Sequence, residues 1–272
     1  RNEKVIDAIS ETVKAVSGVR LLDVDPGHST NRTVVTFVGS PDDVVEAAFQ
    51  CIARASQLID MRHHHGEHPR MGATDVCPFV PVSGVSMADC VQLAETLGER
   101  VGRELGIPIY LYGEAAKSPS RKSLADIRSG EYEALSTKMK DSAFKPDFGP
   151  AEFNAKAGAT VIGARPFLVA YNVNLNTRSK KLANAIALNI REAGKAKRSA
   201  SGEIEKDAQG NTIKVPGTLK ECRAVGWYVD EYERAQVSIN LTNFEVTGIH
   251  DAFDEVEREA AKLGVRVTGS EI

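Results

Sequence analysis

The segment "PFLVAYNVNLNTRSKKLANAIALNI", residues 166–190, changes from a strand pattern to a helix pattern and decides the fold of the C-terminal half. In its first part, polar and apolar residues alternate around Val173, as in a strand with two different faces. In its second part, the apolar residues Leu182, Ile186 and Ile190 recur at helical spacing. We therefore predict a strand that is followed directly by a helix.

The residues downstream complete a repeating order of elements. Two further strand patterns follow, "ECRAVGWYVD" (221–230) and "AQVSINL" (235–241). A helical pattern begins near Ile249, and a last short strand is "VRVTGS" (265–270). The order is β-α-β-β-α-β, which is the split βαβ pattern of ferredoxin-like domains.

The N-terminal half shows a related order. From Arg1 to Val82 the elements read α-β-β-α-β, followed by one extra helix and strand. This is the same pattern without its first strand, which we expect upstream of Arg1. We predict an α/β (α+β) protein with two ferredoxin-like βαββαβ-type subdomains, residues 1–166 and 167–272, with facing β-sheets and helices on the outer faces.

The composition is that of an ordinary globular protein. The chain has 272 residues, 42% hydrophobic and 26% charged, with a net charge of −3. This charge offers no basic face for nucleic acid, and no apolar run is long enough for a membrane span. No signal peptide is visible. The four cysteines form no CxxC pair, which favours reduced thiols and a cytoplasmic location.

Uncharged polar side chains share one face of two predicted strands. By alternation, Gln236, Ser238 and Asn240 lie opposite the apolar residues of their strand, and Asn172 and Asn174 do the same in theirs. Such a face provides hydrogen-bonding groups for the floor of a ligand pocket. The alternative is a face that simply meets water.

A cluster of histidines lies in "MRHHHGEHPRMGATDVCPFVPVSG", residues 61–84. The consecutive residues His63, His64 and His65 cannot converge on one tetrahedral metal ion, so we predict no metal site. His68 fits better as a general base on a loop, with Glu67 or a facing carboxylate to fix its tautomer. A solvated turn without chemistry is the alternative.

Two acidic residues end the strand in "LLDVDPG", residues 21–27. Asp23 and Asp25 are two residues apart and therefore share a face. Pro26 and Gly27 then turn the chain. A turn capped by Asp25 is the structural alternative to a functional carboxylate.

Several stretches together resemble one enzyme family over nearly the whole chain. The block "GEHPRMGATDVCPF" (66–79) is the most specific of them. The resemblance is to the formiminotransferase domain of the glutamate formimidoyltransferases. The other stretches that carry it are "LLDVDPGHSTNRTVVTFVG", "IPIYLYGEAA", "SGEYEAL", "KPDFGP", "GATVIGARPFLVAYNVNL", "AVGWYVDE" and "QVSINLTNFEVTG".

The resemblance implies a cytoplasmic, homodimeric folate enzyme of histidine degradation. Such an enzyme moves the formimino group of N-formimino-L-glutamate to N5 of tetrahydrofolate, which is the one-carbon acceptor, and releases glutamate. It implies that His68 is catalytic, that Asp25 is its partner, and that one segment contacts the folate. The residues of that segment are Gly149, Pro150, Ala151, Glu152, Phe153, Asn154, Ala155, Lys156, Ala157 and Gly158.

This chemistry suits the residue types. One imidazole can take a proton from the attacking amine and return it to the leaving amine. Arg70 is expected to pair with a substrate carboxylate, and Lys156 with the negative tail of the folate. The rival hypotheses are a glutamate formyltransferase that uses N-formylglutamate, a noncatalytic ferredoxin-like binding module, and a metal hydrolase.

Overall fold

A computed structural model describes residues 2–27, 30–66 and 68–272 of the chain. By their contacts, the residues divide into two compact units, Arg1–Arg165 and Pro166–Ile272. Each unit has its own hydrophobic core, and each is described by itself below.

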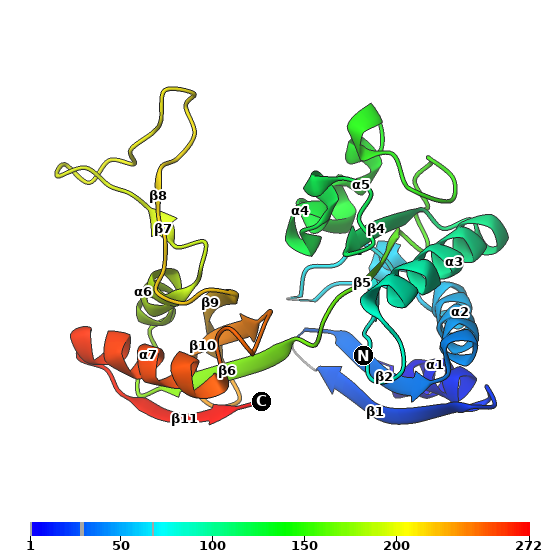
Figure 1. Cartoon of the computed structure of the whole chain (residues 1–272), viewed down its shortest axis with the longest axis horizontal. Helices are drawn as coiled ribbons and strands as arrows, with labels where there is room; N and C mark the ends of the chain where they lie inside the picture. The colour runs from blue at the N-terminus through cyan, green and yellow to red at the C-terminus, as the bar shows by residue number, and fades with distance from the viewer. Residues whose placement is uncertain (1, 28–29, 67) are drawn as a thin grey trace. The chain divides into compact units, whose positions relative to one another are not determined.

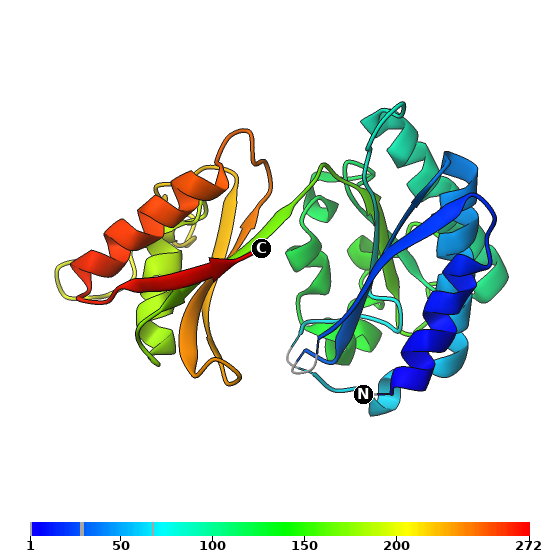
Figure 2. The same ribbon diagram turned by 90° about the horizontal axis from the view of Figure 1, so that it is seen from below.

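The C-terminal unit has the predicted β-α-β-β-α-β order. Its sheet is antiparallel with the strand order β11-β6-β10-β9, and helices α6 and α7 lie on one side of it (Figures 1 and 2). This confirms the ferredoxin-like prediction for the unit. The elements are β6 (Val169–Leu175), α6 (Lys180–Ile190), β7 (Lys195–Ala196), β8 (Lys214–Val215), β9 (Cys222–Val229), β10 (Arg234–Leu241), α7 (Ile249–Lys262) and β11 (Val267–Glu271).

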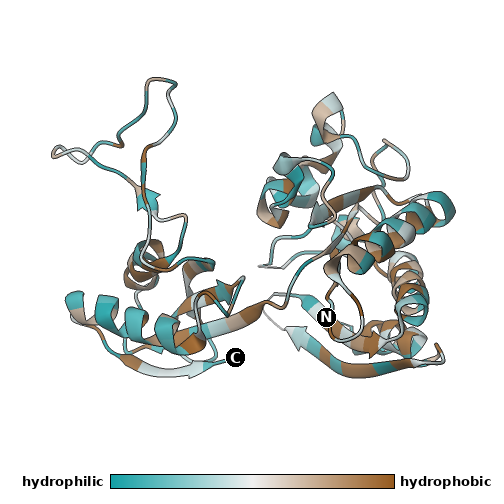
Figure 3. Cartoon of the chain, viewed as in Figure 1, coloured by the Kyte–Doolittle hydropathy of each residue, from teal (hydrophilic) through white to brown (hydrophobic). Residues whose placement is uncertain are grey.

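Alternation along the strands separates the core of this unit from its polar face. Val173 and Val237 point toward the helices and are completely buried, together with Ile186 of α6 and Val256 of α7. Hydrophilic residues follow the outward side of α7 (Figure 3). The polar residues predicted to share a face do so, because Gln236 is paired with Asn174, and Ser238 with Asn172.

Between α6 and β9 the chain makes a long excursion that contains only the short pair β7 and β8 (Figure 1). Isolated bridges between Arg198 and Ile204 and between Lys206 and Thr212 hold its outer turns. Most of its residues are exposed, so it adds little to the core of the unit.

The N-terminal unit begins with a two-stranded hairpin covered by helices. Strands β1 and β2 pair in antiparallel fashion, and α1 and α2 pack against them. The exposed face of the hairpin carries Asp23 and Asp25, as the alternation predicts, together with Arg32. The elements are α1 (Glu3–Lys14), β1 (Val19–Gly27), β2 (Arg32–Gly39), α2 (Pro41–Leu58) and the 3-10 turn η1 (Met61–His63).

The rest of this unit is a parallel three-stranded sheet with the order β3-β5-β4. Ile162 faces α2 and α3, while Tyr110 faces α4 and α5 on the other side. The elements are β3 (Val76–Phe79), α3 (Met87–Leu105), β4 (Ile109–Gly113), η2 (Pro119–Arg121), α4 (Leu124–Arg128), α5 (Glu131–Lys138), η3 (Ser142–Phe144) and β5 (Thr160–Ala164).

This arrangement agrees with the α-β-β-α-β order predicted for the N-terminal half and corrects the prediction that helices lie only on its outer face. Among the described residues β2 and β3 lie in separate sheets, and their common partner in a ferredoxin-like sheet is the first strand, which was expected upstream of Arg1. The parallel sheet also has helices on both faces, as parallel sheets generally require. The mixed α/β class with two subdomains is confirmed.

The close packing of α6 on β9 leads to a prediction about the free energy of unfolding. A Cβ added at Gly226 would lie 2.0 Å from the backbone nitrogen of Asn184 in α6. Gly226→Ala should therefore push the helix from the sheet and lower the free energy of unfolding by roughly 1–3 kcal/mol. Urea denaturation measures this change. Gly269→Ala in the same sheet is the matched control, since no described heavy atom lies within 4 Å of its added Cβ. Equal free energies of unfolding for Gly226→Ala and Gly269→Ala would show that α6 does not pack this closely on β9.

Candidate active site

The His68 ring is half-buried on the loop between η1 and β3. Its Nδ1 lies 2.7 Å from the carbonyl oxygen of Pro69. Because a carbonyl oxygen can only accept, Nδ1 carries the proton in this contact. The neutral ring therefore presents the lone pair of Nε2, which is what a general base needs.

The surroundings of His68 favour the neutral ring. Burial lowers the pKa of His68 below its ordinary value, and the positive charges of Arg32 and Arg128 lower it further. The hydrogen bond to Pro69 and the negative charge of Asp75 oppose this shift without reversing it. The ring is therefore unprotonated at neutral pH and able to accept a proton.

Asp75 and Arg128 form a nearly buried ion pair beside this loop. Their side chains are 10% and 12% exposed. Asp75 also accepts a hydrogen bond of 2.9 Å from the backbone nitrogen of Met71, three residues after His68. The pair thus connects the loop, the start of β3 and the end of α4.

The histidine loop is also tied to the hairpin. The His64 Nε2 donates to the carbonyl oxygen of Asn31 at 2.9 Å, and the Asn31 Nδ2 donates to the carbonyl oxygen of His65 at 2.6 Å. These contacts place Arg32, the first residue of β2, next to the loop. Glu67, the residue expected to fix the tautomer of His68, lies outside the described residues.

Asp25 lies on the exposed face of the same hairpin, two residues before the end of β1. In the described part of the chain it makes no hydrogen bond to His68. Burial lowers the pKa of Arg32 and Arg128 lowers it further, while the negative charges of Asp75 and Asp25 oppose this shift without reversing it. Arg32 therefore connects Asp25 and His68 electrostatically.

The segment 149–158, predicted to contact folate, packs against the chain just beyond His68. The Ala73 nitrogen donates to the Ala157 oxygen at 2.9 Å, and the Ala159 nitrogen donates to the Met71 oxygen at 3.1 Å. Gly158 has a φ of +69°, and a Cβ there would lie 2.1 Å from the Met71 oxygen. The structure thus brings the two predicted site segments together.

The first half of this segment is open to solvent. Phe153 is exposed, and its ring lies 5.4 Å from that of Tyr132, centroid to centroid. The Tyr132 hydroxyl donates to the Ala155 oxygen at 2.6 Å. Lys156 donates to the carbonyl oxygen of Gln57 at 2.9 Å, which uses one of its three N–H groups. Its contact with a folate tail remains a prediction.

Arg70 is held by internal partners in the structure. Its guanidinium is nearly buried and forms ion pairs with Glu131 at 3.0 Å and Glu133 at 2.7 Å. It also donates to the carbonyl oxygen of His64 at 3.1 Å. These partners use both terminal nitrogens of the guanidinium, so Arg70 holds the loop to α5, and its contact with a substrate carboxylate remains a prediction.

The polar face of the C-terminal unit is already organised by internal hydrogen bonds. Gln236 is completely buried, accepts from the Trp227 indole at 2.7 Å, and donates to Asn174 at 2.8 Å and Glu271 at 2.9 Å. Its side chain therefore supports the face, and its predicted contact with the substrate remains a prediction. Ser238 is half-buried and Asn240 is exposed, and the predicted substrate contacts of both remain predictions.

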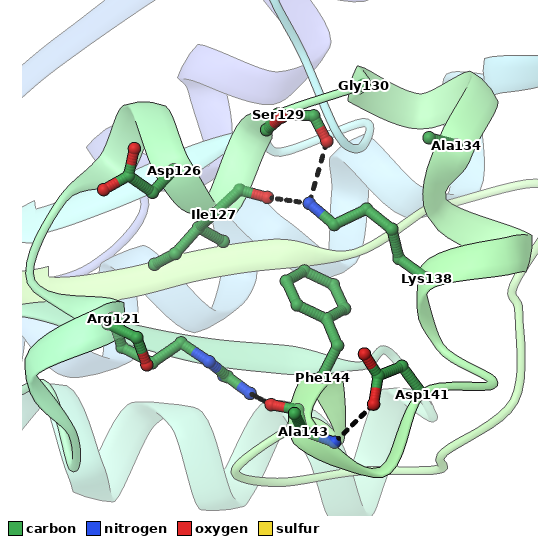
Figure 4. Close-up of a pocket in the computed structure, with 11 residues that line it drawn as sticks. Arg121, Asp126, Ile127, Ser129, Gly130, Ala134, Lys138, Asp141, Ala143 and Phe144 are labelled. Carbon is green, nitrogen blue, oxygen red and sulfur yellow. Dashed lines mark hydrogen bonds between the residues drawn. The ribbon is translucent and has the colours of Figure 1, made fainter. Parts of the chain in front are cut away.

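Two other features of the structure do not form a reaction centre. No three His, Cys, Asp or Glu side chains among the described residues are grouped as metal ligands would be. A hollow near α4 and α5 contains Lys138, but that ammonium group is bonded to the carbonyl oxygens of Ile127 and Ser129, both at 2.8 Å (Figure 4). The ammonium group of Lys138 is therefore occupied by the protein itself.

Sequence analysis missed Asp75 and Arg128 as part of the site. Asp75 lies inside the specific block around His68, so its position was a usable signal. Arg128 lies in the long, mostly polar segment between β4 and β5 and has no local pattern that distinguishes it from a solvated arginine.

The nearly buried Asp75–Arg128 ion pair leads to a second prediction about the free energy of unfolding. Asp75→Asn keeps an acceptor for the Met71 nitrogen but leaves Arg128 without its counter-charge. Breaking such a pair should lower the free energy of unfolding by about 3–5 kcal/mol, as measured in urea. Glu233→Gln, which breaks an exposed pair with Arg178, should leave it nearly unchanged. An Asp75→Asn protein as stable as the parent would show that the pair is not structural.

None of the helices that the structure describes combines the length and apolar character that crossing a membrane requires.

Comparison with known proteins gives a consistent result for both units. The family model of the formiminotransferase domain, N-terminal subdomain, matches residues 1–165, and that of the formiminotransferase domain matches residues 170–272.

Individual relatives agree with the family models. The chain is 53% identical to the formimidoyltransferase-cyclodeaminase of Sus scrofa, with 100% of the chain and 47% of that protein covered. The chain thus spans about half the length of the curated animal relatives it matches. It is 42% identical to the glutamate formimidoyltransferase of Streptococcus pyogenes and 43% identical to that of Thermoplasma acidophilum, covering 84% and 83% of those proteins. The chain therefore belongs to the formiminotransferase family.

Proposed function

We propose that this protein is a glutamate formimidoyltransferase. It moves the formimino group of N-formimino-L-glutamate to N5 of tetrahydrofolate and releases L-glutamate. Its full-length similarity to microbial proteins of that name supports the proposal. The observation that carries it is the His68 ring, whose Nδ1 proton is committed to Pro69 while Nε2 keeps its lone pair.

In the first step, N5 of the reduced folate attacks the carbon of the formimino group. A new N–C bond forms, and N5 must lose its proton as it becomes bonded to carbon. Nε2 of His68 accepts this proton. Because its surroundings lower the pKa of His68, the ring is in the required neutral form near pH 7.

In the second step, the bond between the formimino carbon and the glutamate nitrogen breaks. The His68 imidazolium returns its proton to that nitrogen, so glutamate leaves as an amine. The formimino group is an amidine and carries positive charge near neutral pH. Asp25, on the exposed face of the hairpin, supplies the negative charge that stabilises it.

The acceptor is held by the segment 149–158 in this proposal. Exposed Phe153 offers an aromatic face, and exposed Lys156 retains two N–H groups for an anionic tail. Positioning both substrates supplies a large part of the rate. No metal is required for these steps.

We also propose a cytoplasmic homodimer. Four free cysteines, three of which have a pKa raised by burial to about 11 or 12, suit a reducing compartment. The dimer follows from the family resemblance, and sedimentation of the purified protein would test it.

The reaction is tested by giving purified protein tetrahydrofolate together with either N-formimino-L-glutamate or N-formyl-L-glutamate. We expect the absorbance of the folate product to appear with the formimino donor, because a carboxylate such as Asp25 stabilises an amidinium better than a developing oxyanion. Faster product formation from the formyl donor would favour the rival formyltransferase. No product from either donor would favour a noncatalytic binding module.

The role of His68 is tested by His68→Ala. The variant should fold like the parent and lose roughly 10² to 10⁴ in kcat, since proton transfer contributes about this factor. In the parent, the acid limb of the kcat/KM profile should lie below the ordinary imidazole pKa, because burial and two arginines lower the pKa of His68.

Asp25→Asn serves as the comparison for this variant. Asp25→Asn should lower kcat more than it lowers the affinity for tetrahydrofolate, because the proposed action of Asp25 is on the cationic donor.

A His68→Ala variant that keeps kcat within tenfold of the parent would remove His68 from the mechanism.

A further inference from the structure

Glu271, at the end of β11, has a carboxylate with three neutral partners on the polar face of the C-terminal sheet. Its Oε1 accepts from the Asn172 Nδ2 at 3.2 Å and from the Gln236 Nε2 at 2.9 Å. Its Oε2 accepts from the Tyr232 hydroxyl at 3.2 Å. No lysine or arginine in the described part of the chain forms an ion pair with it. The charge is therefore held in place but not neutralised.

The support behind this carboxylate is rigid. Gln236 is only 1% exposed, and its amide oxygen and both amide N–H groups are bonded to Trp227, Asn174 and Glu271. The amide cannot rotate without losing these bonds in a buried position. Glu271 is thus preorganised before any ligand arrives.

Exposed apolar side chains lie on the same side of the sheet. Register pairs Trp227 with Gln236, and Val225 with Ser238, so these residues share the polar face. Trp227 is 37% exposed and Val225 is 48% exposed. Tyr232, bonded to Glu271 from the β9–β10 turn, is 48% exposed. Aromatic and branched side chains of this kind provide a surface for a flat ring.

A carboxylate has about four acceptor sites, of which three are used here. A ligand N–H can therefore bind to the remaining site of Oε2. A second N–H would replace the hydroxyl of Tyr232, which lies in an exposed turn. The negative charge of Glu271 raises the pKa of Tyr232, which keeps this hydroxyl protonated and neutral.

We propose that the face formed by Glu271, Trp227 and Val225 binds the pterin ring of a reduced folate. The carboxylate accepts hydrogen bonds from the ring's N3–H and 2-amino groups, while the flat ring covers the apolar side chains. This inference rests on the proposed function for its ligand. An aliphatic amine would satisfy the carboxylate but leave the apolar surface uncovered.

The test uses the whole chain and its single tryptophan, Trp227, as the reporter. 5-Formyltetrahydrofolate, a stable reduced folate, should quench Trp227 fluorescence in the parent. Glu271→Gln should weaken this binding by about 10- to 100-fold, the range expected for hydrogen bonds to a charged group. p-Aminobenzoylglutamate, which lacks the pterin ring, should bind the parent and the variant equally well.

The control is Glu257→Gln on the exposed side of α7, which removes the same charge from the same unit. It should leave the affinity for 5-formyltetrahydrofolate unchanged. If Glu271→Gln does not fold, the parent is titrated with a tetrahydrofolate analogue that lacks the 2-amino group, which should bind at least tenfold more weakly. An affinity within threefold of the parent in the variant, or within threefold of the normal ligand for the analogue, would overturn the inference.

The outcomes separate this inference from the proposed function. A parent that transfers the formimino group while Glu271→Gln binds folate normally overturns only the pterin site. A parent that is inactive with both donors but binds 5-formyltetrahydrofolate in a Glu271-dependent way overturns only the transfer reaction.

Discussion

The N-terminal unit depends on one close approach between two stretches of backbone, at Gly72 and Gly158. The two residues form an antiparallel bridge, and flanking hydrogen bonds join Met71 to Ala159 and Ala73 to Ala157. A side chain at Gly158 would collide with the Met71 oxygen and would also strain its positive φ. Because β3 and β5 pair directly beyond this bridge, the histidine loop and the segment 149–158 enter one sheet side by side. The position of His68 is therefore a consequence of sheet pairing.

Charge then determines what the loop can do. A half-buried imidazole beside Arg32 and Arg128 loses its proton more easily than one in water, because each guanidinium disfavours a second positive charge. Asp75 forms an ion pair with Arg128 and so compensates part of this field. The His68 ring is therefore uncharged although charged groups surround it. Its hydrogen bond to Pro69 determines which of its two nitrogens is basic.

The C-terminal unit could be predicted from its sequence because each strand alternates and each helix has an apolar stripe. The N-terminal unit was predicted less well, since the central strand β5 has five buried residues in a row and no alternation, and its sequence "TVIGA" follows a long polar connection. Ion pairs between residues far apart in the sequence could not be predicted either. Asp75 and Arg128 are 53 residues apart, and Arg70 binds glutamates more than 60 residues away. Local patterns contain no information about such partners, so the glutamates that hold Arg70 could not be predicted from the sequence.

The two units hold charged groups in opposite ways, and this difference bears on which ligands each can accept. In the N-terminal unit, arginines near His68 create a positive environment that Asp75 only partly offsets. In the C-terminal unit, Glu271 is held by an amide from Asn172, an amide from Gln236 and a phenol, which stabilise its charge but leave its field intact. A lysine in their place would have neutralised the carboxylate and removed its attraction for N–H donors. Neutral partners therefore leave the charge of Glu271 able to attract N–H donors, while the arginines near His68 act mainly by keeping that ring unprotonated.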